Sequence, residues 1–386
     1  MRFAPFLRLI ASVVLLVCLA APRSASALEH VTFRRDGKTF QVAGRVEVTA
    51  EDGGLLVLGR DGMLWRVEPQ QLVKRSKDEE PFTPLSAAEL SKRLLADLPK
   101  GFAVYPTAHY LVCYNTSRGY AQWCGSLLER LYLAFTNSWS RKGFALSEPA
   151  WPLVAIVFAD RQSYAKYAQP EIGEAAQSIV AYYNLESNRI TMYDLTGSEA
   201  AGQPTERSVA ALINRLLSQP EAEWNVATIV HEATHQIAFN CGLHTRLSDC
   251  PRWFSEGIAL YFETPDVTSI KGWRNIGAVN KIRLARFLEY VPRRPSDSLV
   301  TLLAGEKRFH DPKQALDAYA ESWALTFYLI QKHPKQYVAY LRLLAEKKPL
   351  LADDPATRLA EFKQAFGEDL RRLDAEFVRY MSRGVR

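Results

Sequence analysis

A pair of histidines flanks a glutamate in the segment His231-Glu232-Ala233-Thr234-His235. On a helix, residues four apart are about 40° from eclipsed, so both imidazoles reach one point beside the same face. That point can hold a metal ion. Glu232 is rotated by about 100° from His231, which places its carboxylate beside the metal and lets it take a proton from water.

A third ligand is expected, because a catalytic zinc site typically uses three protein side chains and leaves one position open. Glu256 supplies it. The segment 253–263 around Glu256 has helical periodicity, and Pro251 lies near its start. We therefore expect His231, His235 and Glu256 to bind Zn²⁺, with Glu232 as general base.

These motifs resemble those of the gluzincin metallopeptidases, in which HExxH is followed by a glutamate ligand in a second helix of the form (N/S)-E-G-x-A. Here residues 255–259 read S-E-G-I-A. The resemblance implies that His231, His235 and Glu256 are zinc ligands and that Glu232 is the base in peptide-bond hydrolysis. Metzincins continue H-x-x-G-x-x-H, and the sequence after His235 departs from that pattern.

Three segments also resemble the DUF1570 group of exported bacterial proteins: HEATHQIAFN (231–240), WFSEG (253–257) and YAESWAL (319–325). This resemblance extends over roughly residues 85–345. It implies a zincin-like peptidase fold and says little about the substrate, because that group is defined mainly by sequence.

A zinc peptidase also stabilises the oxyanion of its tetrahedral intermediate, commonly with a tyrosine or a histidine. Tyr319 is the candidate, since it lies near the start of a helix, in a position similar to that of the catalytic tyrosine in some gluzincins. The alternative is a tyrosine of the core. The rival side chains are Tyr182, Tyr183, Tyr261 and His244.

Supporting residues are also expected near the metal. Glu263 follows Glu256 by about two helical turns and either orients a ligand histidine or lies at a solvated helix end. Asn240 and Arg283 are further candidates, with structural or surface roles as the alternative. The strand at 190–193 is expected at the edge of a sheet, where a peptide substrate can add as another strand.

The elements that position these residues define an α+β protein. Residues 31–73 alternate apolar and polar side chains between Asp-Gly turns, which predicts a small, barrel-like all-β module at 28–75. The polar, proline-containing stretch 76–84 is expected to be a linker.

A zincin-like domain is expected at 85–386, with a mixed sheet part to about residue 224 and a helical part at 225–386. In the sheet part, helices are predicted at 86–98 and 121–139, strands at 110–114 and 153–158, and a hairpin at 179–193. In the helical part, Asn225 is expected to cap a helix at 226–239, and further helices are predicted at 253–263, 313–332, 336–346 and 356–381.

The first 27 residues have the pattern of a secretory signal peptide. Arg2 and Arg8 precede an apolar run at 9–20, and Ala25-Ser26-Ala27 offers a small-x-small cleavage site. We expect export to the periplasm or the medium and no stable membrane span after cleavage. The alternative, an uncleaved anchor, would require a longer apolar run to span a bilayer.

The net charge limits the possible binding partners, and the cysteine spacing limits the possible disulfides. Loss of the three arginines in residues 1–27 lowers the formal net charge from +6 to +3, which leaves no dense basic stripe and excludes nucleic acid as a partner. Export favours two local disulfides, Cys113 with Cys124 and Cys241 with Cys250. A four-thiolate zinc site is the alternative, but the sequence lacks C-x-x-C spacing.

Two functions from different classes follow. The first is zinc-dependent cleavage of a peptide or protein substrate. The second is a catalytically silent envelope scaffold that keeps the fold and docks an envelope protein through residues 28–75. Hydrolysis of a non-peptide amide would use the same residues as the first.

Overall fold

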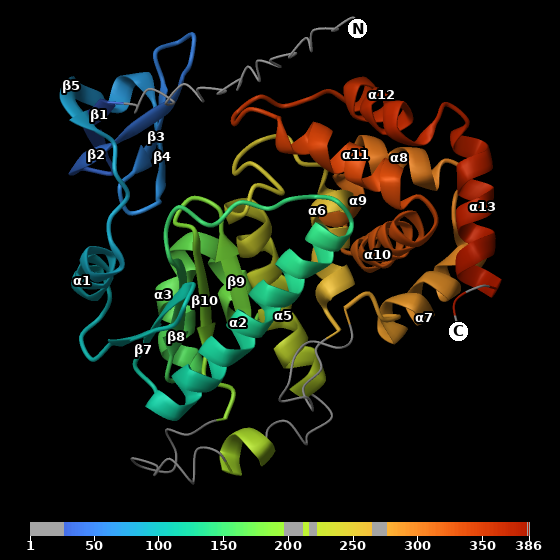
Figure 1. The fold of residues 1–386 in the computed structure, drawn as a ribbon, viewed down its shortest axis with the longest axis horizontal. Helices are drawn as coiled ribbons and strands as arrows, with labels where there is room; N and C mark the ends of the chain where they lie inside the picture. Colours follow the sequence, from blue (N-terminus) through green and yellow to red (C-terminus); the bar gives the residue numbers. More distant parts are fainter. Residues whose placement is uncertain (1–26, 197–210, 216–221, 265–275, 384, 386) are drawn as a thin grey trace, which may run out of the picture.

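The computed structural model describes residues 27–196, 211–215, 222–264, 276–383 and 385. The protein is α+β, 52% helical and 20% strand, with an all-β N-terminal region and a helical C-terminal region. Figure 1 shows the all-β region above a mixed sheet and the helical region to the right of that sheet. The predicted signal peptide lies outside the described residues except for Ala27. Within the described residues, every helix is too short or too polar to span a bilayer.

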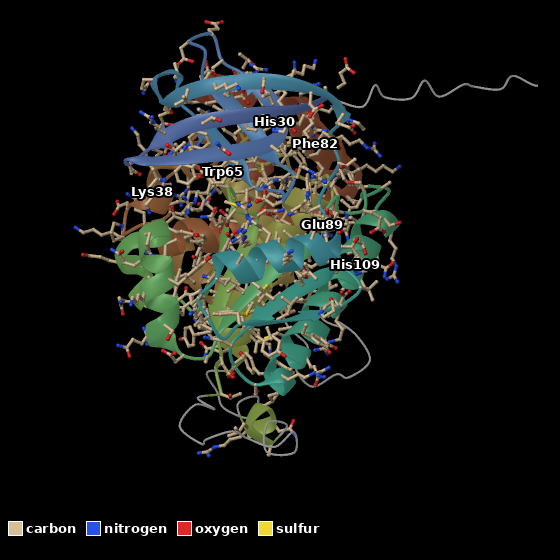
Figure 2. All side chains as sticks on the ribbon, turned by 90° about the vertical axis from the view of Figure 1, so that its left-hand side faces the viewer. His30, Lys38, Trp65, Phe82, Glu89 and His109 are labelled. Atoms are coloured by element: carbon tan, nitrogen blue, oxygen red, sulfur yellow. The ribbon has the colours of Figure 1, made fainter. Side chains whose placement is uncertain are left out.

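The β-module is a five-stranded antiparallel sheet with the order β4-β3-β2-β1-β5. Val31, Phe33, Leu55, Val57 and Val67 form its small apolar core. Figure 2 shows the module above helix α1 (Ala87–Asp97), which carries Glu89. The five strands are β1 (Ala27–Arg35), β2 (Lys38–Thr49), β3 (Leu55–Gly59), β4 (Leu64–Val67) and β5 (Leu72–Pro81).

The linker predicted at 76–84 is wrong over most of its length, because β5 continues to Pro81. Glu29 pairs with Lys77 and His30 with Ser76 across β1 and β5. β5 is an edge strand, and its side chains are mostly exposed. Charged residues suit such an edge, so polar composition alone could not distinguish strand from linker.

The second sheet has the order β6-β7-β8-β10-β9, with β7, β8 and β10 parallel and β6 and β9 antiparallel at the edges. The expectation that 190–193 forms the edge is wrong: β10 lies inside the sheet and β9 is the edge strand. Four of the five residues of β10 are buried, as suits an interior strand. The strands are β6 (Ala103–Pro106), β7 (Tyr110–Tyr114), β8 (Leu153–Phe158), β9 (Ala181–Asn184) and β10 (Arg189–Tyr193).

Helices cover both faces of this sheet. Side chains alternate along β8, so Ala155 and Val157 pack with helices α2 (Arg118–Arg141) and α5 (Ala222–Asn240). Val154 and Ile156 pack on the other face with α1 and α3 (Arg161–Ile172).

The helical part surrounds α10 (Ala315–Lys332), which is buried over most of its length. The single helix predicted at 356–381 is two helices, because Gly367 adopts a φ of 99° and ends the first of them. The other helices are α6 (Arg252–Phe262), α7 (Lys281–Tyr290), α8 (Ser298–Ala304), α9 (Lys307–His310), α11 (Pro334–Ala345), α12 (Pro355–Phe366) and α13 (Leu370–Arg383).

The predicted disulfides are not formed, and all four cysteines are free thiols. Cys113 and Cys124 belong to the apolar clusters on opposite faces of the sheet. Cys241 lies in the core, whereas the Cys250 sulfur lies 3.8 Å from Nδ1 of His244. Closeness along the chain therefore does not bring either pair together.

The β-module is joined to the rest of the chain at the β9–β10 hairpin. The N–H of Leu64 donates to the carbonyl of Glu186 at 2.8 Å. The guanidinium of Arg246 donates to the carbonyls of Gly62 at 2.9 Å and Leu185 at 3.2 Å. This end of the module is therefore occupied by contacts within the same chain.

Candidate metal centre

Helix α5 presents the two histidines because its opposite side is held against the sheet. Five apolar residues of that side are fully buried: Val226, Ile229, Val230, Ala233 and Ile237. Gln236, which sequence reasoning missed, donates to the carbonyls of Val154 at 3.0 Å and Asn188 at 2.9 Å. The helix begins at Ala222, so Asn225 lies within it and is not its cap.

Helix α6 brings Glu256 to the same place because it packs very closely on α10. A Cβ atom at Gly257 would lie 2.1 Å from Oγ1 of Thr326 and 2.8 Å from the carbonyl oxygen of Ser322. Only glycine allows this approach. Gly257, directly after the predicted third ligand Glu256, thus sets the position of the helix that carries both residues.

The three predicted ligands converge. Nε2 of His231 lies 3.1 Å from Oε2 of Glu256 and 3.2 Å from Nε2 of His235, and Nε2 of His235 lies 3.7 Å from Oε2 of Glu256. Tetrahedral zinc, with ligands at about 2.0–2.1 Å, separates its ligand atoms by about 3.3 Å. Two imidazole nitrogens and one carboxylate oxygen are also a donor set that zinc accepts. The residues present therefore fit a zinc ion.

The electrostatics of the cluster are those of a tightly coupled acid–base group. Burial alone lowers the pKa of His231, but the hydrogen bond to Glu256 and the nearby carboxylates outweigh it and raise the pKa to about 9. Burial alone raises the pKa of Glu256, whereas its hydrogen bonds to the two histidines hold it far below its ordinary value. Positive charge is thus favoured where the three side chains meet.

The second nitrogen of each histidine also faces a polar side chain. Nδ1 of His235 lies 3.3 Å from the hydroxyl of Ser255. Nδ1 of His231 lies 3.9 Å from Oε1 of Glu263, whose side chain is 7% exposed and is held by Arg283 at 3.3 Å. Glu263 is therefore not a solvated helix end, and it can orient a ligand histidine. Sequence reasoning missed Ser255, although its position directly before Glu256 was the available signal.

Glu232 lies beside the cluster and contacts the edge of the sheet. Its Oε2 accepts a hydrogen bond from the backbone N–H of Tyr183 at 2.8 Å. Burial raises the pKa of Glu232, although His231 and His235 act in the opposite direction. A carboxylate with a raised pKa is a better proton acceptor than an ordinary glutamate.

Tyr319 lines the same cleft as the three ligands. Its hydroxyl accepts a hydrogen bond from Nη2 of Arg252 at 3.3 Å, and Nε of Arg252 lies 3.6 Å from Oε1 of Glu256. Burial, reinforced by the charge of Glu256, raises the pKa of Tyr319. The phenol is therefore protonated at neutral pH and can donate a hydrogen bond into the cleft.

The four alternatives to Tyr319 as the oxyanion-stabilising residue lie in different places. Tyr183 lines the cleft, whereas Tyr182 packs on the other face of the sheet and Tyr261 lies in the core. His244 is buried, and burial lowers its pKa to about 3. Asn240 has a structural role, since its side chain bonds Asn188 and the Gln236 carbonyl.

A cleft of about 650 Å³ opens onto the cluster. Its walls include the β9–β10 hairpin at Tyr183 and Leu185, the inward sides of α5 and α6, and Tyr319 of α10. This volume is typical of a ligand pocket.

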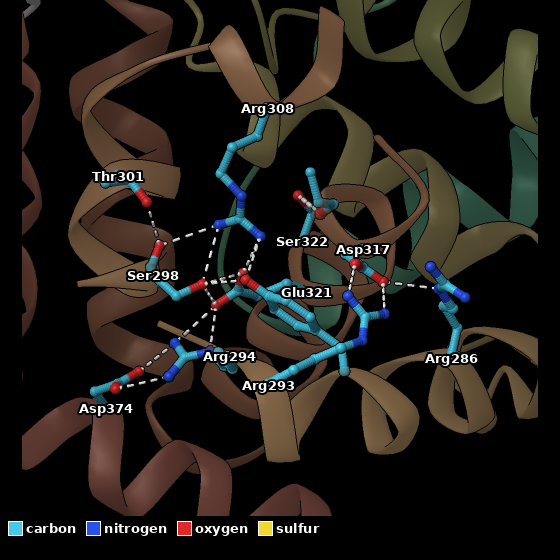
Figure 3. A network of polar contacts seen from close by, with 12 residues as sticks. Arg286, Arg293, Arg294, Ser298, Thr301, Arg308, Asp317, Glu321, Ser322 and Asp374 are labelled. Carbon is cyan, nitrogen blue, oxygen red and sulfur yellow. Dashed lines mark hydrogen bonds and ion pairs between the residues drawn. The ribbon is translucent and has the colours of Figure 1, made fainter. Parts of the chain in front are cut away.

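A buried polar network holds the helix that carries Tyr319. Glu321 is fully buried and contacts Arg294 at 2.7 Å, Arg308 at 2.7 Å and Ser298 at 2.8 Å. Figure 3 shows both guanidinium groups directed at this carboxylate. The segment YAESW therefore combines a tyrosine that lines the cleft with a glutamate that fixes the start of α10.

The fold and cluster define an α+β protein with a candidate His-His-Glu metal site at the junction of sheet and helical part. Residues 225–351 match the family described as "Protein of unknown function (DUF1570)". The matched segment contains all of the metal-cluster residues and Tyr319, but it begins at 225 and not near 85 as the resemblance suggested. No curated protein matches the chain.

Proposed function

We propose that the chain is an exported zinc peptidase of the gluzincin type, with a zincin-like arrangement of the mixed sheet and helices α5 and α6. The observation that carries the proposal is the convergence of His231, His235 and Glu256 at ligand spacing, with Glu232 directly beside them. When bound, zinc would polarise the scissile carbonyl and make water more acidic. The alternative is a catalytically silent envelope scaffold.

The residues of the chain divide the remaining work. Glu232 takes the proton from the attacking water and returns it to the leaving amine. Tyr319 donates its phenolic proton in a hydrogen bond to the developing oxyanion. Ser255, 3.3 Å from Nδ1 of His235, orients that imidazole by a hydrogen bond, and Glu263 faces Nδ1 of His231 at 3.9 Å as a nearby negative charge.

A peptide is favoured as substrate because the edge strand β9 borders the cleft at Tyr183. Strand β9 is the outer strand, and the N–H of Tyr183 points away from β10, toward Glu232. Ala181, two residues earlier, presents its backbone groups on the same side. An extended peptide can therefore pair with β9 and pass Glu232.

Metal analysis and cleavage of a peptide library test the proposal. Purified protein should hold about one zinc per chain. Glu232→Gln should keep the zinc and lose about 10²- to 10⁴-fold in cleavage rate. His235→Ala should lose the metal. Zinc without turnover in the parent protein would favour the scaffold, and absence of zinc at micromolar metal would refute the zinc peptidase.

A further inference from the structure

Arg252 is a cationic residue of the cleft that has no role in the chemistry proposed above. It is the first residue of α6, and its side chain is 34% exposed and lines the cleft beside Ser255 and Glu256. A guanidinium carries five N–H donors. Among the described residues, its hydrogen bond is the one to Tyr319.

The aromatic rings of Phe309 and Tyr319 hold the Arg252 guanidinium in place. Its central carbon lies 5.7 Å from the ring centroid of Phe309, and that ring meets Tyr319 edge-on with centroids 5.3 Å apart. Stacking on Phe309 and the bond to Tyr319 fix the plane of the group. An arginine fixed in this way loses little further freedom when it binds a ligand.

Among the described residues, the carboxylate paired with Arg252 is that of Glu256, whose Oε1 lies 3.6 Å from Nε. The other oxygen of Glu256 faces the two histidines. Glu263 pairs with Arg283 at 3.3 Å, away from Arg252. With one hydrogen bond within the described part of the chain, to Tyr319, the guanidinium keeps N–H donors for a carboxylate of a ligand.

We propose that Arg252 binds a carboxylate of the substrate, so that the cleft selects peptides bearing a negative charge close to the scissile bond. The planar fork of arginine matches a carboxylate in two parallel hydrogen bonds. Since Arg252 neighbours a metal ligand and one extended residue spans about 3.3–3.6 Å, the carboxylate lies within about two residues of the cleaved bond. Its source is either the free C-terminus or an acidic side chain.

This inference deepens the proposed function, and its test uses binding as well as turnover. N-acetyl-trialanine and its C-terminal amide compare the terminal carboxylate with its neutral analogue. N-acetyl-Ala-Glu-Ala amide and the corresponding Gln peptide do the same for an acidic side chain. Affinities are measured by calorimetry with Glu232→Gln protein, both zinc-loaded and metal-free, and cleavage is measured with otherwise unaltered protein.

Protein with Arg252 intact should bind the acidic peptide of at least one pair about 10- to 100-fold more tightly than the neutral peptide of that pair. Arg252→Met in the Glu232→Gln background should remove that preference while leaving amide binding within about threefold, and Arg252→Lys should restore part of it. Arg372→Met, at an exposed position on α13, is the control and should keep the full preference. The pair that shows the effect identifies the source of the carboxylate.

Equal affinity for acid and neutral ligands in both pairs would overturn the inference. So would an equal loss of both ligands in Arg252→Met, because that is what a residue that only positions Glu256 and Tyr319 would produce. Failure of the proposed function looks different: zinc is absent, or no peptide is cleaved, whatever the affinity for carboxylates.

Discussion

The carboxylate of Glu232 accepts a hydrogen bond from the backbone N–H of Tyr183 at 2.8 Å, which joins helix α5 to the edge strand β9. Of the two residues, one belongs to the HExxH motif and the other lies 49 positions earlier in the chain. The bond therefore sets the position of the proposed general base relative to β9, where we propose that an extended substrate binds.

The hydrogen bond predicts different stabilities for two variants of Glu232. A glutamine retains an acceptor oxygen for the N–H of Tyr183, whereas alanine leaves that N–H without a partner. The free energy of unfolding of Glu232→Ala should therefore be about 1 kcal/mol lower than that of Glu232→Gln. Urea titrations followed by circular dichroism measure the difference. Identical midpoints for the two variants would show that the bond contributes nothing to stability.

The side chains behind the ligand histidines should tune metal affinity. Ser255→Ala and Glu263→Gln should each weaken zinc binding by about 10- to 100-fold without removing a ligand. Competition with a chromogenic chelator gives the dissociation constants. Ser126→Ala, on the exposed side of α2 and outside the cleft, is the control. If both variants hold zinc as tightly as the parent, the histidines are oriented by the helices alone.

Close packing of α6 on α10 makes Gly257 sensitive to any added atom. Gly257→Ala should lower the free energy of unfolding by about 1–3 kcal/mol, because the new methyl group overlaps Thr326 and the Ser322 carbonyl. Thr326→Ala removes the nearer obstacle, so the double variant should recover part of the loss. Strictly additive losses in thermal melts would contradict this account of the packing.

Asp249, in the loop between α5 and α6, should make stability depend on acid pH. Burial alone raises its pKa, but Arg358 and Lys347 outweigh burial and lower the pKa below its ordinary value. A carboxylate with a lowered folded-state pKa stabilises the protein above its unfolded-state pKa, about 4, and loses that contribution as pH falls through the folded-state pKa.

Asp249→Asn should therefore cost about 3 kcal/mol at pH 7, since the aspartate side chain is 6% exposed, and the gap to the parent should shrink below about pH 4. Asp97→Asn removes an exposed partner of Arg93 and should change stability by less than about 0.5 kcal/mol. A gap independent of pH would mean that the charge of Asp249 is not what stabilises the loop.

The cysteines should behave as thiols. A protein lacking residues 1–27 contains four cysteines, all of them free in the structure. In denaturant without reductant, a thiol reagent should therefore count about four groups per chain, and reductant should leave the melting temperature unchanged. A count near zero would restore the two disulfides that the spacing suggested.

Strong local patterns predict several elements correctly. Strands β7 and β8 begin and end as predicted, and the helix predicted at 86–98 is α1, at Ala87–Asp97. The ends of elements that lack a local signal could not be predicted from the sequence. Polar residues in β5 resembled a linker, and a continuous helical periodicity hid the break at Gly367.

The sequence by itself determined the residue types of the site and their order, because the HExxH spacing places two imidazoles on one side of a helix and the S-E-G segment supplies a carboxylate. Only the tertiary structure decided that these groups meet, that Glu232 contacts an edge strand and that Arg252 shares the cleft. Such distances depend on how helices and strands pack across long stretches of chain. The same long-range packing prevents the predicted disulfide between Cys113 and Cys124, because their side chains lie on opposite faces of the second sheet.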